Sequence, residues 1–149
     1  MANKLTWAKA NVEISTTAQN SDLNQAGFEG LSYTKINSTG SAGDWSATDN
    51  IINYNTLDDD VSQKQKGVKN AGDPQIECAY ISDDAGQLAM VAAAAAVDAY
   101  AFKLTLSSGD IWYARGIVGG GGLGGGGGRE DFVVRQFTIG LVQAAFLAS

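Results

Sequence analysis

The sequence predicts a mainly β fold with one α-helix, arranged as a single domain over residues 1–149. Two observations support the fold class: residues 99–106 alternate strictly between apolar and small or polar side chains, and only residues 85–97 have the composition of a helix. The third observation is the length, because about 150 residues suffice to bury a core in one domain.

The predicted strands follow one another along most of the chain. A turn at 107–110 joins the strand at 99–106 to a second one at 111–118, so these residues should form a hairpin. We predict further strands at 12–16, 31–36, 51–57, 75–81 and 131–141, the last of which could continue to 147. Residues 1–11 are a possible N-terminal arm, and 37–75 should be a long loop region containing one strand.

The predicted helix is unusual because it is apolar on every side. Asp83 or Asp84 can cap it, Gln87 stands in the capping-box position after Asp84, and five consecutive alanines fill residues 92–96. A helix that is apolar all round should be covered all round, so we expect a neighbouring subunit to cover part of it; packing within the monomer is the alternative. The candidate packing residues are Ala89, Ala92, Ala93 and Ala96.

The glycine-rich segment is a local anomaly. Of 19 glycines, nine lie in residues 119–128, interrupted only by Leu123. The run satisfies the Gly-x-Gly-x-x-Gly pattern, but a phosphate loop opens a helix, whereas this run leads through Arg129 into a predicted strand. We therefore expect a mobile loop between two strands, because ordering glycine costs much backbone entropy.

Composition removes most catalytic chemistry. The chain has no histidine and a single cysteine, Cys78, so histidine-dependent triads, His-liganded zinc and internal disulfides are excluded. Cys78 is expected to be a small buried side chain. The run Asp58-Asp59-Asp60 does not match a calcium loop, and Trp7, Trp45 and Trp112 are too dispersed to predict a stacking platform. No catalytic, cofactor or metal site is predicted, and no segment is apolar enough for a signal peptide or a membrane span.

Charge is distributed in blocks along a chain with net charge −6. Residues 41–62 contain five acidic and no basic side chains, and Lys64, Lys66 and Lys69 follow directly. We identify Asp58, Asp59 and Asp60 as a candidate acidic patch that faces an anionic molecule without binding it, and the three lysines as a candidate basic patch. The alternative is a solvated acidic surface. A nucleic-acid binder is not predicted because it needs a basic face.

Short motifs in a fixed order resemble the tail tube proteins, also called major tail proteins, of bacteriophages with long non-contractile tails. The resemblance covers about residues 12–143. It rests on the segments 14–16 (IST), 22–31 (DLNQAGFEGL), 54–58 (YNTLD), 64–68 (KQKGV), 70–74 (NAGDP), 84–87 (DAGQ), 100–103 (YAFK) and 115–116 (RG), and on the final strand around Phe137. The glycine run departs from the family pattern.

The resemblance implies a β-sandwich or barrel subunit with a flanking helix, forming a ring-wide β-barrel in stacked hexameric rings. The implied partners are further copies of the chain, a tape measure protein, a tail terminator and a distal tail protein. DNA would pass through an acidic lumen without specific binding. Asp58, Asp59 and Asp60 would then be a candidate lumen or inter-ring acidic patch, and Lys64, Lys66 and Lys69 a candidate inter-ring basic patch. The tube would assemble in the host bacterial cytoplasm and reside in the virion tail. The alternatives are a monomeric β-sandwich ligand-binding module, a carboxylate-dependent hydrolase using Asp58 to Asp60 or Glu130 and Asp131, and a tube protein of a contractile injection or secretion system.

Overall fold

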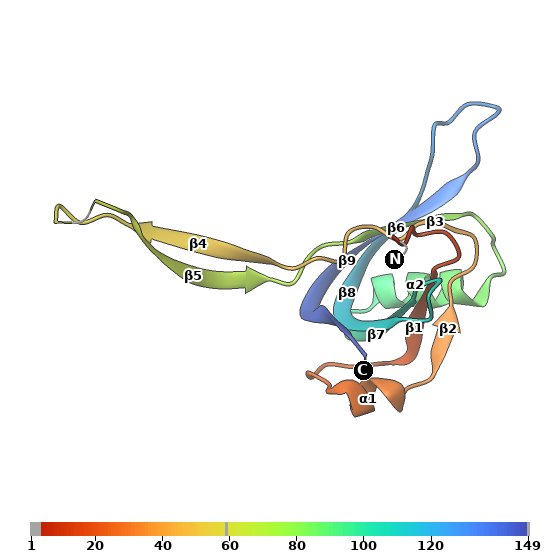
Figure 1. Ribbon diagram of the computed structural model, residues 1–149. Helices are drawn as coiled ribbons and strands as arrows, with labels where there is room; N and C mark the ends of the chain where they lie inside the picture. Colours follow the sequence, from red (N-terminus) through yellow and green to blue (C-terminus); the bar gives the residue numbers. More distant parts are fainter. Residues whose placement is uncertain (1–3, 59, 149) are drawn as a thin grey trace.

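The fold consists of one large antiparallel sheet, two helices and a separate hairpin (Figure 1). The structure, a computed structural model, describes residues 4–58 and 60–148. Its elements are β1 (Asn11–Ala18), α1 (Gln25–Glu29), β2 (Tyr33–Lys35), β3 (Thr39–Ser41), β4 (Thr48–Tyr54), β5 (Gln63–Asn70), β6 (Gln75–Ala79), α2 (Ala85–Ala95), β7 (Ala99–Thr105), β8 (Ile111–Gly124) and β9 (Val134–Leu147). Seven strands form a sheet in the order β2-β1-β7-β8-β9-β6-β3, while β4 and β5 pair only with each other.

The main core lies on the face of the curved sheet that α2 covers. Phe102 and Leu104 of β7, Phe137 and Ile139 of β9, and Met90 of α2 are buried together there. The predicted hairpin is present, with Leu104 opposite Trp112, and the mainly β fold class is confirmed. The sheet ends at β2 and β3, and among the described residues no strand pairs with the outer edge of either one.

The second face of the sheet carries a smaller apolar cluster under α1. Phe28 stacks on Tyr113 with ring centroids 5.3 Å apart, and Phe146 approaches Phe28 edge-on at 5.5 Å. Helix α1 was not predicted, because five residues capped by Asn24 are too few to show a helical period. Both faces of β7 are therefore covered, and Ala101 is as fully buried as Phe102.

Helix α2 begins where the sequence predicts. The Asp84 side chain accepts a hydrogen bond from the Gln87 amide at 3.0 Å, which satisfies one of the free donors of the first turn. Gln87 is fully buried, and its amide group donates to the Ala79 carbonyl at 2.7 Å and accepts from the Ile81 amide at 3.1 Å. A Cβ at Gly86 would overlap the Lys35 carbonyl oxygen, so glycine permits the close packing of α2 on β2.

The structure corrects two predictions about loops. Residues 37–75 contain three strands, β3, β4 and β5, instead of one. Strand β5 escaped prediction because its lysines and glutamines are exposed on both faces and show no alternation. The first half of the glycine run is also not a loop: Gly119–Gly124 continue β8, with Gly120 opposite Phe137 on β9. Glycine keeps its backbone N–H and C=O groups, so it can extend the ladder.

Candidate assembly surfaces

The β4–β5 hairpin, residues 48–70, projects from the body as an arm (Figure 1). Every residue of its two strands is exposed except Gly67, which is half-buried. The exposed set includes large apolar side chains: Ile52 is 53% exposed, Tyr54 70% and Leu57, at the turn, fully. An isolated two-stranded ribbon is only marginally stable in water, and exposed apolar patches mark interaction sites. The arm therefore has the properties of a surface that a partner covers.

The register of the arm places the three predicted lysines on one face. Lys69 lies opposite Asp49, Lys66 opposite Ile51 and Lys64 opposite Asn53, and directly opposed residues share a face of an antiparallel pair. Lys66 and Lys69 are three residues apart, and would face opposite sides in a regular strand. An irregularity between Asp49 and Ile51 gives β5 one extra residue, which restores the common face.

The opposite face of the arm is uncharged and partly apolar. It presents Ile52 opposite Gln65 and Tyr54 opposite Gln63. The arm thus has a basic face and an apolar face, back to back. This separation was not predictable without the register, because the sequence interleaves the two sets of residues.

The predicted acidic patch lies at the turn of the arm. Asp58 and Asp60 are exposed there, beyond the ends of both strands, and Asp59 lies outside the described residues. Among the described residues no cluster of three or more His, Cys, Asp or Glu side chains is placed to hold a metal ion. The assignment of these acids to a lumen or to an inter-ring contact stays a prediction.

The outer side of α2 is a second exposed apolar surface. Leu88 is 50% exposed and Val91 37%, and Ala92 and Ala95 are also exposed. The four predicted packing residues do not share this surface: Ala93 is fully buried in the core of its own chain, Ala89 and Ala96 are half-buried, and Ala92 is exposed. Ala93 is therefore inaccessible to a neighbouring subunit.

The three tryptophans are not dispersed in space, contrary to the interpretation drawn from their spacing. Trp7, Trp45 and Trp112 line one pocket of about 540 Å³, together with Leu104 and Leu106 at the end of β7. Trp45 is fixed by its indole N–H, which donates to the Ala42 carbonyl at 2.7 Å, and by its contact with the Phe102 ring, 5.8 Å away. Contacts between elements so far apart in sequence leave no local signal, which is why the spacing was misleading. We call this cavity the tryptophan pocket.

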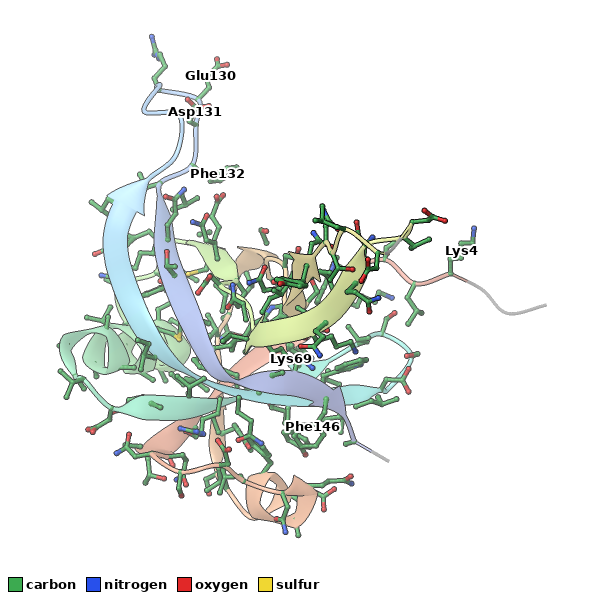
Figure 2. All side chains as sticks on the ribbon, turned by 90° about the vertical axis from the view of Figure 1, so that its left-hand side faces the viewer. Lys4, Lys69, Glu130, Asp131, Phe132 and Phe146 are labelled. Carbon is green, nitrogen blue, oxygen red and sulfur yellow. The ribbon has the colours of Figure 1, made fainter. Side chains whose placement is uncertain are left out.

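The glycine stalk, residues 119–133, is the second segment that projects from the body, after the arm (Figure 2). At its tip the Asp131 carboxylate accepts a hydrogen bond from the Gly128 amide at 2.9 Å. A Cβ at Gly126 would overlap that carboxylate, so another residue there would displace the Asp131 side chain. Phe132, next in the chain, is 84% exposed. Figure 2 shows Glu130 and Asp131 at the tip, well beyond the end of the sheet, and Phe132 at the base of the stalk, close to the sheet.

Arg115 is a buried charged side chain whose contacts lie within the chain. The buried Arg115 side chain binds the Asp22 carboxylate at 2.6 Å and the Gln19 carbonyl at 3.1 Å, which fastens the segment before α1 to β8. Cys78 is buried as predicted, and burial raises the pKa of its thiol. Neither described helix has the length and apolar character needed to cross a membrane.

Burial and hydrogen bonding oppose each other at Asp84. Burial alone would raise the pKa of this carboxyl group, but hydrogen bonds from the Asn37 side chain and from the amides of Gln87, Asn37 and Gly86 lower it below its usual value. The carboxylate thus joins the start of α2 to the β2–β3 connection.

Comparison with known structures identifies the fold. A chain of the six-fold symmetrised baseplate of the anti-feeding prophage superposes with a TM-score of 0.64 at 10% identity, covering 100% of this chain and 98% of that one. A chain of the extended sheath-tube complex of the extracellular contractile injection system PVC gives 0.63 at 10% identity, covering 98% and 92%. A chain of the tube-terminating cap of the anti-feeding prophage gives 0.60 at 12% identity, covering 100% and 93%.

No protein-family model matches the chain, and no curated protein matches its sequence. The resemblance to non-contractile tails is thus supported in its coarser form only. The chain shares its fold with chains of the anti-feeding prophage cap and baseplate and of the PVC sheath-tube complex, with nearly the whole length of both chains aligned.

Proposed function

We propose that this chain is a non-enzymatic structural subunit of a phage-like tail tube, in a tailed virion or in a contractile injection particle. The observation that carries the proposal is the arm. It holds Ile52, Tyr54 and Leu57 in water, away from the body that could cover them. A subunit that associates with copies of itself gives such side chains a place to be buried.

The proposed assembly is a stack of hexameric rings. The unpaired edges of β2 and β3 allow sheets of neighbouring subunits to continue one another into a ring-wide barrel. A matching chain belongs to a particle described as six-fold symmetrised, which agrees with six subunits per ring. Tape measure, terminator and distal tail proteins are the partners that such a tube needs at its interior and ends.

The charge supports a conduit that does not retain anionic cargo. Apart from the three lysines grouped on one face of the arm, the chain carries 7 basic and 16 acidic side chains, so its remaining charge is strongly negative. Phosphate groups are repelled by such a surface. We therefore propose that DNA, where it is the cargo, slides through the lumen without specific binding, and that the basic face of the arm binds an acidic surface of a neighbouring subunit.

The test is to remove the arm and keep the body. Deleting residues 51–66 joins Asn50 directly to Gly67, and Asn-Gly is suited to a two-residue turn. We expect the full chain to form rings or tubes in negative-stain images, and the shortened chain to fold but remain monomeric. A full chain that stays monomeric at every concentration, salt and pH would refute the proposal.

The basic face of the arm allows a milder test. Replacing Lys64, Lys66 and Lys69 by glutamine keeps the strand and removes its charge. Assembly of this variant should weaken and lose its dependence on salt, while the matched change of Gln63 and Gln65 to alanine on the opposite face should leave the salt dependence intact. Salt dependence is measured by sedimentation at several ionic strengths.

A further inference from the structure

Resting on the proposed tube function, we infer that Phe132, at the base of the glycine stalk of one copy, inserts into the tryptophan pocket of the next copy along the tube. The two features lie at opposite ends of the same pair of strands. Trp112 and Ala145 at the pocket belong to β8 and β9, and so do the residues that enter and leave the stalk.

The geometry suits a head-to-tail contact. Trp112 stands at the start of β8 and Leu123 near its end, roughly 35 Å of strand apart at about 3.3 Å per residue. A donor at one end and an acceptor at the other make a heterologous interface, which repeats from copy to copy without closing. This is the arrangement needed for growth along an axis. Figure 2 shows Phe132 at the end of the sheet from which the stalk projects.

The chemistry of the two surfaces matches. The pocket is walled by Trp7, Trp45 and Trp112 and by two leucines, and aromatic side chains pair favourably with other aromatic side chains. At about 540 Å³ it is large enough to accept a phenylalanine side chain and part of its neighbour Val133, which is 53% exposed. Phe132 has no such surroundings in its own chain, where 84% of it is exposed.

Charges around the two surfaces are also complementary. Asp44 lies in the wall of the pocket, and Lys4 precedes the wall residue Leu5. The stalk carries Arg129 and Glu130 beside Phe132. Insertion of Phe132 brings Arg129 and Glu130 of the stalk toward the pocket rim, where Asp44 and Lys4 carry the opposite charges. This pairing favours one orientation of the stalk.

This contact gives the glycine run a purpose. Between residues 119 and 128 only Leu123 has a side chain, so the outgoing half of the stalk is narrow. Gly125, beside the Phe132 backbone, adds no side chain that would hinder the approach of another copy to Phe132. The tight turn that Gly126 and Asp131 form also holds Phe132 in a defined place, which lowers the entropy lost on binding.

The test uses two variants that should complement each other. Phe132→Asp removes the inserted aromatic side chain and leaves the pocket intact, whereas Trp7→Glu disrupts the pocket wall and leaves Phe132 intact. Both positions are more than half exposed, so the fold should tolerate each change. Association is measured by sedimentation velocity over a range of concentrations. The conservative variants Phe132→Trp and Trp7→Phe keep an aromatic side chain at each position, and they should recover most of the association that the charged variants lose.

We expect each disruptive variant to associate at least about thirtyfold more weakly than the original chain, the loss typical of an aromatic anchor. An equimolar mixture of the two should form heterodimers at concentrations where either alone is monomeric, because the Trp7→Glu variant supplies Phe132 and the Phe132→Asp variant supplies an intact pocket. Normal association of Phe132→Asp, or a mixture no more associated than its parts, would overturn the inference while leaving the tube function in place.

Two other occupants of the pocket give distinct results. If Leu57 of another copy's arm filled it, Trp7→Glu would impair association and Phe132→Asp would not. If a small apolar molecule filled it, neither variant would alter association. Both results overturn the inference. An original chain that never associates contradicts the proposed function itself.

Discussion

The body and the projections of this protein use similar side chains to opposite ends. In the body, Phe102 of β7 is fully buried in the main core; on the stalk, Phe132 is almost wholly exposed. The arm likewise holds Ile52 and Tyr54 in water, whereas Ile76 in β6 is fully buried. The difference teaches that folding the monomer depends on the body, and that the apolar surface of the projections becomes useful only when another molecule covers it.

The largest contrast should come from one substitution made in both regions. Phe102→Ala leaves a cavity in the core and should lower the free energy of unfolding by about 3–5 kcal/mol. Phe132→Ala should change it by less than about 0.5 kcal/mol, because that side chain is exposed in the monomer. Urea unfolding of dilute, monomeric protein measures both. Equal losses would contradict the division between body and projections.

Two adjacent residues of α2 make the same comparison within one helix. Ala93→Glu forces a charge into the core and should cost about 3 kcal/mol or more, whereas Ala92→Glu lies on the exposed side and should be nearly neutral. Ala94, which packs partly against the core, should give an intermediate loss when changed to Glu. Ala92→Glu then probes the outer side of α2 in assembly, and its sedimentation should be compared with that of the original chain.

Glycine also differs between the two regions. Gly86→Ala places a Cβ against the backbone of Lys35 and should lower the free energy of unfolding by about 1–3 kcal/mol through overpacking. Gly122→Ala in the stalk is the matched control, because its Cβ would meet nothing within 4 Å. Thermal unfolding of the two variants measures the contrast. If Gly122→Ala were the more damaging, the stalk would contribute to the fold.

The smallest expected effect concerns Asp84. Asp84→Ala removes the cap of α2 and should cost about 1–2 kcal/mol near neutral pH. The pKa of the folded carboxyl group is below that of the unfolded chain, so the stabilisation is complete above the usual carboxyl range and is lost as the pH falls through the lower, folded value. The difference in unfolding free energy between the two proteins should therefore be constant near neutral pH, begin to shrink below about pH 5, and continue to shrink as the pH falls below the usual carboxyl value of about 4. A difference that grows as the pH falls would contradict this role.

Some of the fold followed from local pattern alone. Alternation located the strand at 99–106 and its hairpin, and the capping residues with the alanine run located α2, because these signals arise within a few residues. The sequence also shows that the chain has no histidine, which excludes histidine-dependent triads and His-liganded zinc. It predicted the burial of Cys78 correctly as well.

The structure alone decided which distant residues meet. Three tryptophans 38 or more residues apart form one pocket, three lysines reach one face through an added residue in β5, and half of the glycine run becomes strand because β9 lies beside it. Each depends on pairing between segments remote in sequence, for which side-chain pattern carries no signal. Local periodicity therefore predicted the strands and the helix that build the body. The surfaces proposed for assembly depend on the register between paired strands and on contacts between segments distant in sequence.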